Sequence, residues 1–381
     1  MGEQALDVRH ADVIVIGGGL HGCSAALHLA RAGLEPLVLE KDTIGRHASG
    51  VNAGGVRRLG RHPAEIPLSV ASMELWHRIG ELVDDDCAFE SHGQIKVAES
   101  EADLEKLRAR VAQVRALGFE HEELIDAREL RELLPAAGPQ CVGGIVCRRD
   151  GAALPYRTTL AFRRKAEALG ATVLEGTRVT ALTRSGGTWT VRTASGSHEA
   201  PFVVNAAGAW AGRFAAALGE PVPLEAIALM LMISAPVAPF VRPVVGATSR
   251  TLSFKQFANG TVLIGGGHKG RAELETNRTT LDFHQLAINA QSAAAIFPCM
   301  RGADIVRAWA GIEGRMPDDI PVIGPSSTQP GLWHAFGFSA HGFQLGPIVG
   351  SIIAELVTRG TSSLPIEPFS IRRFQAMHQA A

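Results

Sequence analysis

The sequence predicts an α/β (α+β) chain that combines a parallel sheet covered by helices with a mainly antiparallel sheet. Three observations support this prediction. Residues 11–40 show strand, helix and strand patterns in turn, which is the order of a β-α-β unit. Residues 171–204 and 305–356 return to buried-strand and helix patterns. Residues 224–266 are rich in strand-forming segments, so we expect two discontinuous domains between which the chain crosses more than once.

The elements of the N-terminal half follow from apolar periodicity and from turn residues. The β-α-β unit consists of a strand at 11–16, a helix at 20–32 and a strand at 36–40. The segment 45–60 is glycine-rich and irregular, and a helical pattern at 66–83 follows it. A polar surface helix is expected at 99–117. Asp126 and Glu129 form a capping box that opens another short helix.

The C-terminal half alternates strands and helices in a similar way. A helix at 156–169 leads to a strand at 171–174, and a hairpin joins 179–183 to 188–193 through "SGG". A buried strand is expected at 202–204 before the strand-rich block. The last expected elements are a helix at 279–296, strands at 305–312 and 332–336, and an amphipathic helix from about 342 to 356.

Composition and charge narrow the classes of protein to consider. Of the 381 residues, 46% are apolar and 20% are charged, which is an ordinary globular composition. The 37 basic and 38 acidic residues nearly cancel, so we expect no surface for nucleic acid. The longest apolar stretch, 227–241, contains two prolines and is shorter than the ~20 residues that a transmembrane helix needs. No transmembrane segment is therefore expected.

Cysteine usage and the N-terminus favour a cytoplasmic location. The five cysteines are an odd number without a CxxC pair, so neither a disulfide framework nor a metal site is expected. The first ten residues are polar and lack the charged-then-apolar order of a signal peptide.

Glycines at the first strand–helix junction form the pattern G-x-G-x-x-G. Gly17, Gly19 and Gly22 follow an apolar strand and open a helix, so backbone N–H groups converge on one point that suits an anion. Glu40, followed by Lys41, ends the second strand, where its carboxylate can bond a ribose hydroxyl. These residues predict Rossmann-like dinucleotide binding, since an empty turn would leave Glu40 unexplained. They disfavour NADP but do not separate NAD from FAD.

Three distant segments favour a flavin over a nicotinamide. The segment 45–60 is a small-residue loop that lets a flat ring approach the backbone. The segment "VVNAAGAW" (203–210) is a second strand-to-helix junction made of small residues. The segment "FSAHGFQLGP" (338–347) supplies a late helix N-terminus that would stabilise negative charge on a reduced flavin. A nicotinamide dehydrogenase has no need of these additional approaches.

The same segments resemble a known family. The blocks "DVIVIGGGLHG", "VVNAAGAW", "WAGIEGRMPDDIPVIG" and "FGFSAHGFQLGP" are similar to those of the D-amino-acid-oxidase-like flavoproteins, which include glycine oxidase and the sarcosine oxidases. The resemblance extends from residue 11 to about 358. Within this family, "ASGVNAGG" and "SAHGFQLGP" most resemble bacterial hydroxyproline or proline dehydrogenases, opine oxidases and sarcosine oxidase β-type chains.

The resemblance implies a domain division. A Rossmann-like FAD-binding domain would comprise residues 1–85, 145–220 and 301–381. A mainly antiparallel β-sheet substrate domain would comprise residues 86–144 and 221–300.

The resemblance also implies FAD as the cofactor and places residues around it. Gly17, Gly19, Gly22, Glu40 and Lys41 would hold the diphosphate and ribose, and Ser49, Asn52, Ala53 and Gly54 would lie against the flavin. Val179, Ala207, Gly208 and Trp210 would lie near the adenine, and Gly342, Phe343 and Gln344 near the pyrimidine edge. Gly311 stands where sarcosine oxidase has a tethering cysteine, so FAD is expected to bind without a covalent bond.

The implied reaction oxidises the C–N bond of a small primary or secondary amino acid, such as D-hydroxyproline, D-proline, sarcosine or glycine. A hydride passes to flavin N5, and the imine product then hydrolyses. His268 and His341 are candidate catalytic residues, and His341 has the better claim because it precedes the late helix. Each of the two histidines could equally be structural. Lys269 lies one residue away from an oxygen-activating lysine of sarcosine oxidase, which predicts a dehydrogenase with weak oxidase activity.

Glu313 departs from the family pattern. In glycine oxidase and its relatives an arginine that pairs with the substrate carboxylate stands at this place. We therefore expect Glu313 to hold the substrate's amine or a hydroxyl, while Arg57, Arg250 or Arg315 takes the carboxylate. The alternative is that Glu313 pairs with one of these arginines and never meets substrate.

Two other functional classes remain open at this point. The chain could be the flavin-binding subunit of a larger electron-transfer dehydrogenase of the opine oxidase type, inactive alone, or it could be an NAD-linked dehydrogenase. The electron acceptor, whether oxygen, a quinone or a partner subunit, is not defined by the sequence.

Overall fold

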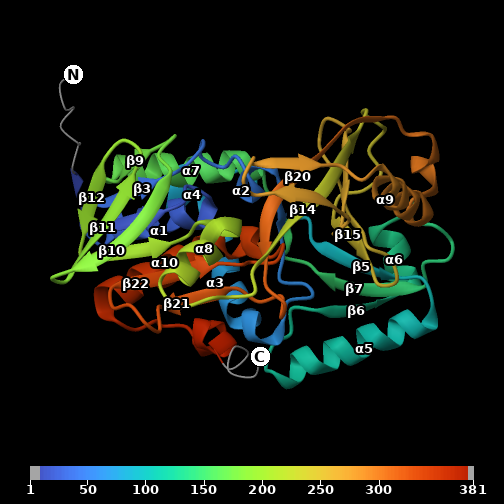
Figure 1. Cartoon of the computed structure of the whole chain (residues 1–381). Coiled ribbons are helices and arrows are strands. Elements are labelled where there is room, and N and C mark those ends of the chain that lie inside the picture. The colour runs from blue at the N-terminus through green and yellow to red at the C-terminus, as the bar shows by residue number, and fades with distance from the viewer. Residues whose placement is uncertain (1–8, 376–381) are drawn as a thin grey trace.

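Two sheets of different character form the two halves of the described chain, residues 9–375 of the computed structural model (Figure 1). Residues 1–8, which make up most of the segment where no signal peptide is expected, lie outside the described residues, as do residues 376–381. The predicted fold class, a Rossmann-like domain with a mainly antiparallel sheet domain, is confirmed.

The first half contains a six-stranded sheet in which all neighbours except β21 and β22 run parallel. Parallel neighbours cannot be joined by a tight turn and need longer crossover connections, which are usually helical. The strands themselves come from three separate parts of the chain. The strand order is β21 (Val322–Pro325), β22 (Leu332–Phe336), β13 (Phe202–Asn205), β2 (Val13–Ile16), β3 (Pro36–Leu39) and β9 (Thr172–Leu174).

Side-chain alternation along β2 explains why this sheet is covered on both faces. Val13 and Val15 pack in the cluster that includes the helices, whereas Ile14 and Ile16 pack on the opposite face. That opposite face meets a second, four-stranded sheet with the order β1 (Arg9–His10), β12 (Ser197–Ala200), β11 (Thr188–Thr193) and β10 (Val179–Ser185). All four side chains of β2 are therefore buried.

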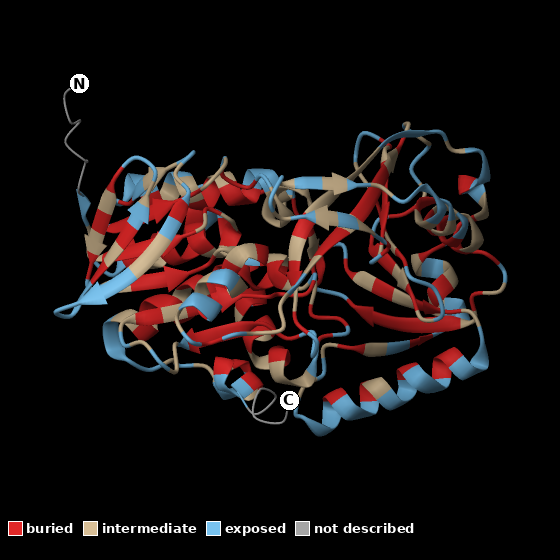
Figure 2. Cartoon of the chain, in the orientation of Figure 1, coloured by how far each residue is buried: buried red, intermediate tan, exposed pale blue. Residues whose placement is uncertain are grey.

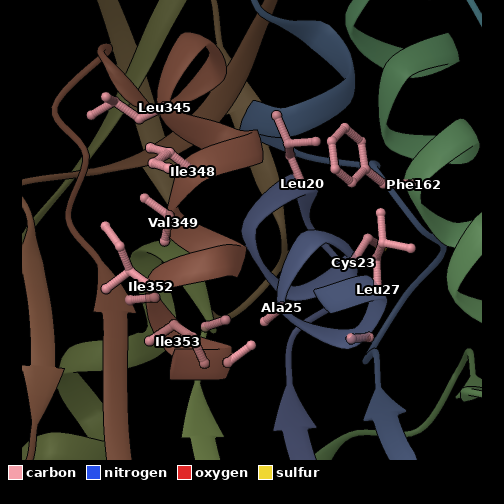
Figure 3. Packing of buried hydrophobic residues seen from close by; sticks show 14 of the residues in the cluster. Leu20, Cys23, Ala25, Leu27, Phe162, Leu345, Ile348, Val349, Ile352 and Ile353 are labelled. Atoms are coloured by element: carbon pink, nitrogen blue, oxygen red, sulfur yellow. The ribbon is translucent and has the colours of Figure 1, made fainter. Parts of the chain in front are cut away.

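Helix α1 (Leu20–Arg31) is packed between α7 (Pro155–Ala168) and α10 (Gly342–Arg359), as Figure 3 shows. Its first residue, Leu20, lies against Gly346 of α10, and Ser24 lies against Gly350 one turn further on. Small residues at these positions let the two helices approach closely, and the core therefore joins the two ends of the chain.

The second half is built on a larger mixed sheet with β15 and β5 as its one parallel pair. Its order is β19 (Arg278–Thr280), β18 (Lys269–Glu273), β14 (Glu225–Ser234), β17 (Val262–Gly265), β16 (Ser253–Gln256), β15 (Val244–Ala247), β5 (Gln94–Ala98), β7 (Gly143–Cys147) and β6 (Glu123–Asp126). The long strand β20 (Ile305–Arg315) pairs with β14 along its length.

Helices lie on both faces of the larger sheet at its β5–β7–β6 end, because alternate residues of β5 and β7 pack in two different helix-covered clusters. Apolar residues of β5 and β14 pack with α9 (Phe283–Ile296) and the region of α6 (Ala127–Leu133). Helix α5 (Glu101–Ala116) packs on β5, β6 and β7 through a narrow apolar stripe, and its outer face is exposed (Figure 2).

Short elements complete the described chain. They are α2 (Ala48–Val51), β4 (Gly55–Val56), α3 (Ile66–Trp76), α4 (Ile79–Val83), β8 (Gly151–Ala152) and α8 (Ala211–Ala217), with 3₁₀ turns at Pro63–Glu65, Gly208–Trp210, Pro298–Gly302, Glu367–Phe369 and Ile371–Phe374. Among the described helices, none combines the length and the apolar character that crossing a bilayer requires.

The structure differs from the sequence expectation in several elements. The helix expected at 66–83 is interrupted at residues 77–78, and the one expected at 279–296 starts only at Phe283, after the Asp282 cap. The strands β5, β6, β7 and β18 were not expected. Strand β20 joins the larger sheet although the expected boundary lies at residue 300, and the domain division itself stays a prediction.

We predict that Gly350→Ala destabilises the protein, because the new methyl group would overlap Ser24 side-chain and backbone atoms at the α1–α10 crossing. Overpacking of this kind costs about 1–3 kcal/mol of the free energy of unfolding. Thermal and denaturant unfolding measure the change.

Gly80→Ala in α4 is the matched control, because a Cβ there meets nothing within 4 Å. It should leave stability unchanged or raise it by up to ~1 kcal/mol through helix propensity. Equal effects of the two variants would contradict the packing argument.

Candidate active site

A cavity of about 1070 Å³ lies where the two halves meet. Its walls come from the β2–α1 turn, the end of β3, the segment 45–61 and the start of α10 in the first half. In the second half they come from β5, β14, the segment 244–253 and β20. Segments from all parts of the chain therefore contribute to one site.

The β2–α1 turn is built so that its backbone forms the cavity wall. Gly17 has a φ of +106°, and a Cβ there would overlap the carbonyl of Ala206. A Cβ at Gly22 would overlap the carbonyl oxygen of Gly17, which keeps α1 close beneath the turn. The first N–H groups of α1 have no partner within the helix, so this flat turn fits an anionic diphosphate.

Glu40 supports the turn from the end of β3. Its Oε2 accepts a hydrogen bond from Gly18 N at 2.7 Å, and its Oε1 accepts one from Asp42 N at 2.8 Å. Burial raises the pKa of this carboxyl, and the two backbone N–H groups oppose that rise. A carboxylate has further lone pairs, so Glu40 can still accept a ribose hydroxyl in the cavity that it lines.

A hairpin of the larger sheet closes over the loop after β3. Asn277, in the β18–β19 turn, accepts a hydrogen bond from Lys41 Nζ at 2.8 Å and donates to Asp42 at 3.2–3.3 Å. Lys41 also lies over the ring of Trp210, 3.9 Å from its centre, and Trp210 donates to the carbonyl of Leu274. We call these five residues the clasp, because they connect the two halves at one side of the cavity.

The loop 48–54 presents a small-residue surface to the cavity. Ser49 Oγ accepts a hydrogen bond from Leu20 N at 2.9 Å, so it caps the start of α1. Asn52 is fixed by its own loop, donating to the carbonyl of Ala48 and accepting from Gly54 N. Gly311 on β20 faces this loop, and a Cβ there would overlap Val51. A flat ring system fits against such a wall.

Glu313 faces the same cavity from β20. Its Oε1 accepts a hydrogen bond from Ala340 N at 2.6 Å, just before α10, and no arginine forms an ion pair with it among the described residues. Burial raises the pKa of this carboxyl to about 7, although the Ala340 N–H opposes that rise. Glu313 can therefore exchange a proton near neutral pH.

His341 also lines the cavity, one residue after Ala340, which donates to Glu313. Its Nδ1 is 3.2 Å from Glu65 Oε2, and Arg61 donates to the carbonyl of His341 at 3.0 Å. Burial lowers the pKa of this imidazole, and Arg57 and Arg61 add to that effect while Glu65 opposes it. The contact with Glu65 orients the His341 ring.

Most residues that the sequence singles out lie around this cavity. The residues that line it are Gly17, Gly19, Glu40, Lys41, Ser49, Asn52, Ala53, Gly54, Arg57, Val179, Ala207, Gly208, Trp210, Arg250, Lys269, Gly311, Glu313, Arg315, His341, Gly342 and Phe343. Their individual roles stay predictions.

Three of the expected residues do not line the cavity. Gly22 lies beneath the glycine turn, where it lets the helix approach. His268 is buried with its Nδ1 2.9 Å from Gln285 Oε1 of α9, on the covered side of the larger sheet. Gln344 is fully buried and bonds to Ser69 and Arg61. The first turn of α10 directs its side chain to α3 instead of the cavity.

The three arginines that could bind a substrate carboxylate differ in whether a carboxylate of the protein already pairs with them. Arg250 pairs with Glu99 at 2.7 Å, and Arg315 pairs with Asp319 at 2.8 Å. The guanidinium of Arg57 instead donates to the carbonyl of Leu59, and it has no carboxylate partner within 4 Å among the described residues. Arg57 is therefore the one of the three that is free to meet a substrate carboxylate.

Sequence reasoning missed several cavity residues. Arg61 lines the cavity wall with 1% of its surface exposed, and Lys96 reaches it from the unexpected strand β5. Lys255 of β16 does not line the cavity but is buried close to Gly54, which does, and burial lowers the pKa of its amine to about 8. The cluster of Arg57, Arg58 and Arg61 was a usable signal, whereas nothing in the sequence places Lys96 or Lys255 near it.

Comparisons with known proteins agree with this geometry. The family described as FAD dependent oxidoreductase matches residues 12–356. The chain is 28% identical to a subunit of opine oxidase from Rhizobium meliloti, covering 96% of this chain and 98% of that protein. It is 29% identical to glycine oxidase of Bacillus licheniformis, covering 97% of this chain and all of that protein. The crystal structure of L-proline dehydrogenase from P. horikoshii has a TM-score of 0.90 and 27% identity, over 97% of this chain and 99% of that one.

We predict that Asn277→Gly speeds the release of FAD from the cavity several-fold. The substitution removes the Asn277 hydrogen bonds to Lys41 and Asp42, and glycine keeps the positive φ of 56° without strain. Each lost hydrogen bond to a charged group is worth about 1.5–3 kcal/mol at most, and exposure reduces that value. The release rate is measured from the recovery of FAD fluorescence on dilution.

Thr276→Ala in the same turn is the control, because its hydroxyl donates to Glu273 and to none of the clasp residues. Unchanged release in Asn277→Gly would show that the clasp does not retain the cofactor.

Proposed function

Because the chain belongs to the family of FAD-dependent oxidoreductases, we propose that it oxidises the C–N bond of a small amino acid or amine. The substrate is a primary or secondary amine bearing a carboxylate, of the kind represented by D-hydroxyproline, D-proline, sarcosine and glycine. FAD, when bound, takes up the hydride from the carbon beside the nitrogen. The protein supplies binding, orientation and proton transfer.

The observation that carries this proposal is the position of Glu313 and Arg57 in the cavity that the glycine turn also lines. A carboxylate that titrates near neutrality suits an amine, and an arginine without a carboxylate partner suits a carboxylate. An amino acid carries both groups. The proximity of these residues to a dinucleotide cradle is what a flavin-dependent amine oxidation requires.

Each residue of this site has a specific role in the proposed reaction. Glu313 accepts an N–H of the substrate and takes its proton, since the C–N bond is oxidised from the neutral amine. Arg57 binds the carboxylate, and His341, oriented by Glu65, borders the reacting carbon.

The relatives support the reaction class and differ in their substrates. Glycine, proline and opines appear in the names of the three proteins compared above, and all of these compounds are amines with at least one carboxylate. The arrangement around Glu313 favours a substrate whose nitrogen, and not its carboxylate, faces β20.

A second candidate function is that of a flavin-binding subunit that is inactive alone. The observation in its favour is that the R. meliloti relative is named as one subunit of opine oxidase. Anaerobic addition of candidate amino acids to the purified chain separates the two cases. Bleaching of the flavin colour supports an enzyme that acts alone, whereas colour that persists with every amine favours the role of a subunit.

We predict that FAD is held without a covalent bond. None of the five cysteines lines the cavity, and Gly311 offers no side chain for attachment. Acid precipitation should therefore release the yellow colour into the supernatant. Colour in the pellet would show a covalent link, for which His21, His47 and His341 of the cavity wall would be the candidates.

We predict that kcat/KM of the wild type rises with pH through about 7, because Glu313 must be ionised to accept the substrate's proton. Glu313→Gln cannot take up this proton. It should lose this limb of the profile and about 10²-fold or more of kcat/KM, a typical effect of removing a general base. An unchanged pH profile in Glu313→Gln would make the residue structural.

The stability of the same variant gives an independent check. The raised pKa of Glu313 stabilises the folded state at low pH, and that contribution is lost as pH rises from 4.5 to about 7. Glu313→Gln should therefore become more stable than the wild type by about 1–3 kcal/mol above pH 7, because one pKa unit corresponds to ~1.4 kcal/mol.

A further inference from the structure

Three cations at the end of the cavity formed by β5 lack a carboxylate partner. Arg57 donates to the carbonyl of Leu59, and Arg61 donates to two backbone carbonyls and to the amide of Gln344. The side chain of Lys96, which belongs to β5, forms no hydrogen bond and no ion pair among the described residues. All three line the cavity. The neighbouring arginines behave differently, since Arg58 pairs with Asp150 and Arg110 with Glu122.

Charge does not balance around these three residues. Among residues 9–375, Glu65 is the one carboxylate beside these cations that has no arginine or lysine partner of its own, and it lies against His341. Burial lowers the pKa of His341, which favours the neutral ring. Three cations against one carboxylate leave an excess of two positive charges in a largely buried region.

This excess is costly unless a ligand compensates it. Arg61 has 1% of its surface exposed, and burial together with Arg57 lowers the pKa of its guanidinium to about 9. Burial and Arg57 also lower the pKa of Lys96. Buried charges of this kind are normally paired, so their location at a cavity wall indicates that an anionic ligand completes the pairing.

Strand β5 presents a polar pair at this end of the cavity. Gln94 and Lys96 are alternate residues, so both side chains point into the cavity, while Ile95 and Val97 pack in the opposite core. The side-chain amide of Gln94 makes no hydrogen bond among the described residues, so its Nε2 group can donate to a ligand in the cavity that it lines. An amide and an ammonium group thus lie side by side on one wall, which suits a carboxylate.

We propose that the substrate carries two carboxylates, one facing Arg57 and Arg61 beside His341, and the second facing Lys96 and Gln94. This inference rests on the proposed function, because the first carboxylate belongs to the amino acid that is oxidised. The shared chemistry is an amine with two carboxylates. It is found in N-(carboxyalkyl) amino acids and in amino acids with an acidic side chain.

The charge of such a substrate balances the excess positive charge of the cavity once the amine is neutral. Once Glu313 has taken the amine proton, the substrate carries two negative charges, which equal the excess of two positive charges. A monocarboxylate would leave one buried cation without a partner. Lys96 is therefore a specificity residue. The affinity for a dicarboxylate should exceed that for a monocarboxylate, and this difference depends on Lys96.

Two sulfur analogues that cannot be oxidised at nitrogen test the inference by binding alone. Thiodiacetate carries two carboxylates, and methylthioacetate carries one. Both are titrated into the FAD-loaded chain by calorimetry and by flavin absorbance. Thiodiacetate should bind at least tenfold more tightly to the wild type, as expected for an added charged hydrogen bond. Equal affinities would overturn the inference.

The variant Lys96→Met should lose this tenfold preference, with methylthioacetate affinity changed less than twofold. Lys106→Met on the outer face of α5 is the matched control, since this lysine is 68% exposed in its side chain, and it should keep the preference. A preference that survives in Lys96→Met would overturn the role of Lys96. The wild-type comparison needs no variant, so the inference remains testable if Lys96→Met does not fold.

Anaerobic bleaching separates the two sources of the second carboxylate. Iminodiacetate and N-(1-carboxyethyl)alanine represent the first source, aspartate and glutamate in both configurations the second, and sarcosine and proline the monocarboxylates. Bleaching of the wild type at least tenfold more efficiently by either dicarboxylate group supports the inference. Equal or better bleaching by the monocarboxylates overturns it but leaves the proposed function standing. Absence of bleaching by every amine would count against the proposed function itself.

Discussion

The flat turn between β2 and α1 is the constraint on which the rest of the half that contains the six-stranded sheet depends. A side chain at Gly17 would overlap the carbonyl of Ala206, and one at Gly22 would overlap Gly17 itself. With both glycines in place, α1 starts directly below the sheet edge and can be enclosed by α7 and α10. Ser24 and Pro347 then meet although 323 residues separate them. The backbone of this turn thereby fixes where both ends of the chain meet.

Strand β20 connects this half to the larger sheet. It pairs with β14 over its whole length, and Trp309 donates to the carbonyl of Val51 at 2.9 Å. Arg315, the last residue of β20, forms an isolated antiparallel β-bridge with Phe338, just before α10. Gly311 and Glu313 alternate on the cavity side between these two contacts. One strand therefore places a flat surface next to a carboxylate that titrates near pH 7.

Buried charge is distributed unequally over the cavity. Carboxylates at the end lined by the glycine turn are satisfied by backbone N–H groups, as in Glu40, or by the Lys41 and Asn277 contacts of Asp42. At the β5 end, backbone carbonyls hold Arg57 and Arg61, which orients these two arginines but leaves their charge uncompensated. Such an arrangement orients a guanidinium in advance for an anion that the protein itself does not supply.

The sequence by itself determined the class of fold, the glycine turn with Glu40, and most of the segments that line the cavity. These depend on local patterns of three to twenty residues, namely apolar runs, turn glycines and their spacing. Tertiary structure alone decided which charged residues share the cavity. Lys96 lies on a strand with little local signal, and its position depends on pairing with β7 and β15, far away in sequence. Distant contacts also explain why Gln344 and His268 do not line the cavity. Gln344 bonds to Ser69 and Arg61, and His268 lies against Gln285. The local sequence does not show which face of an element will be turned away by such contacts.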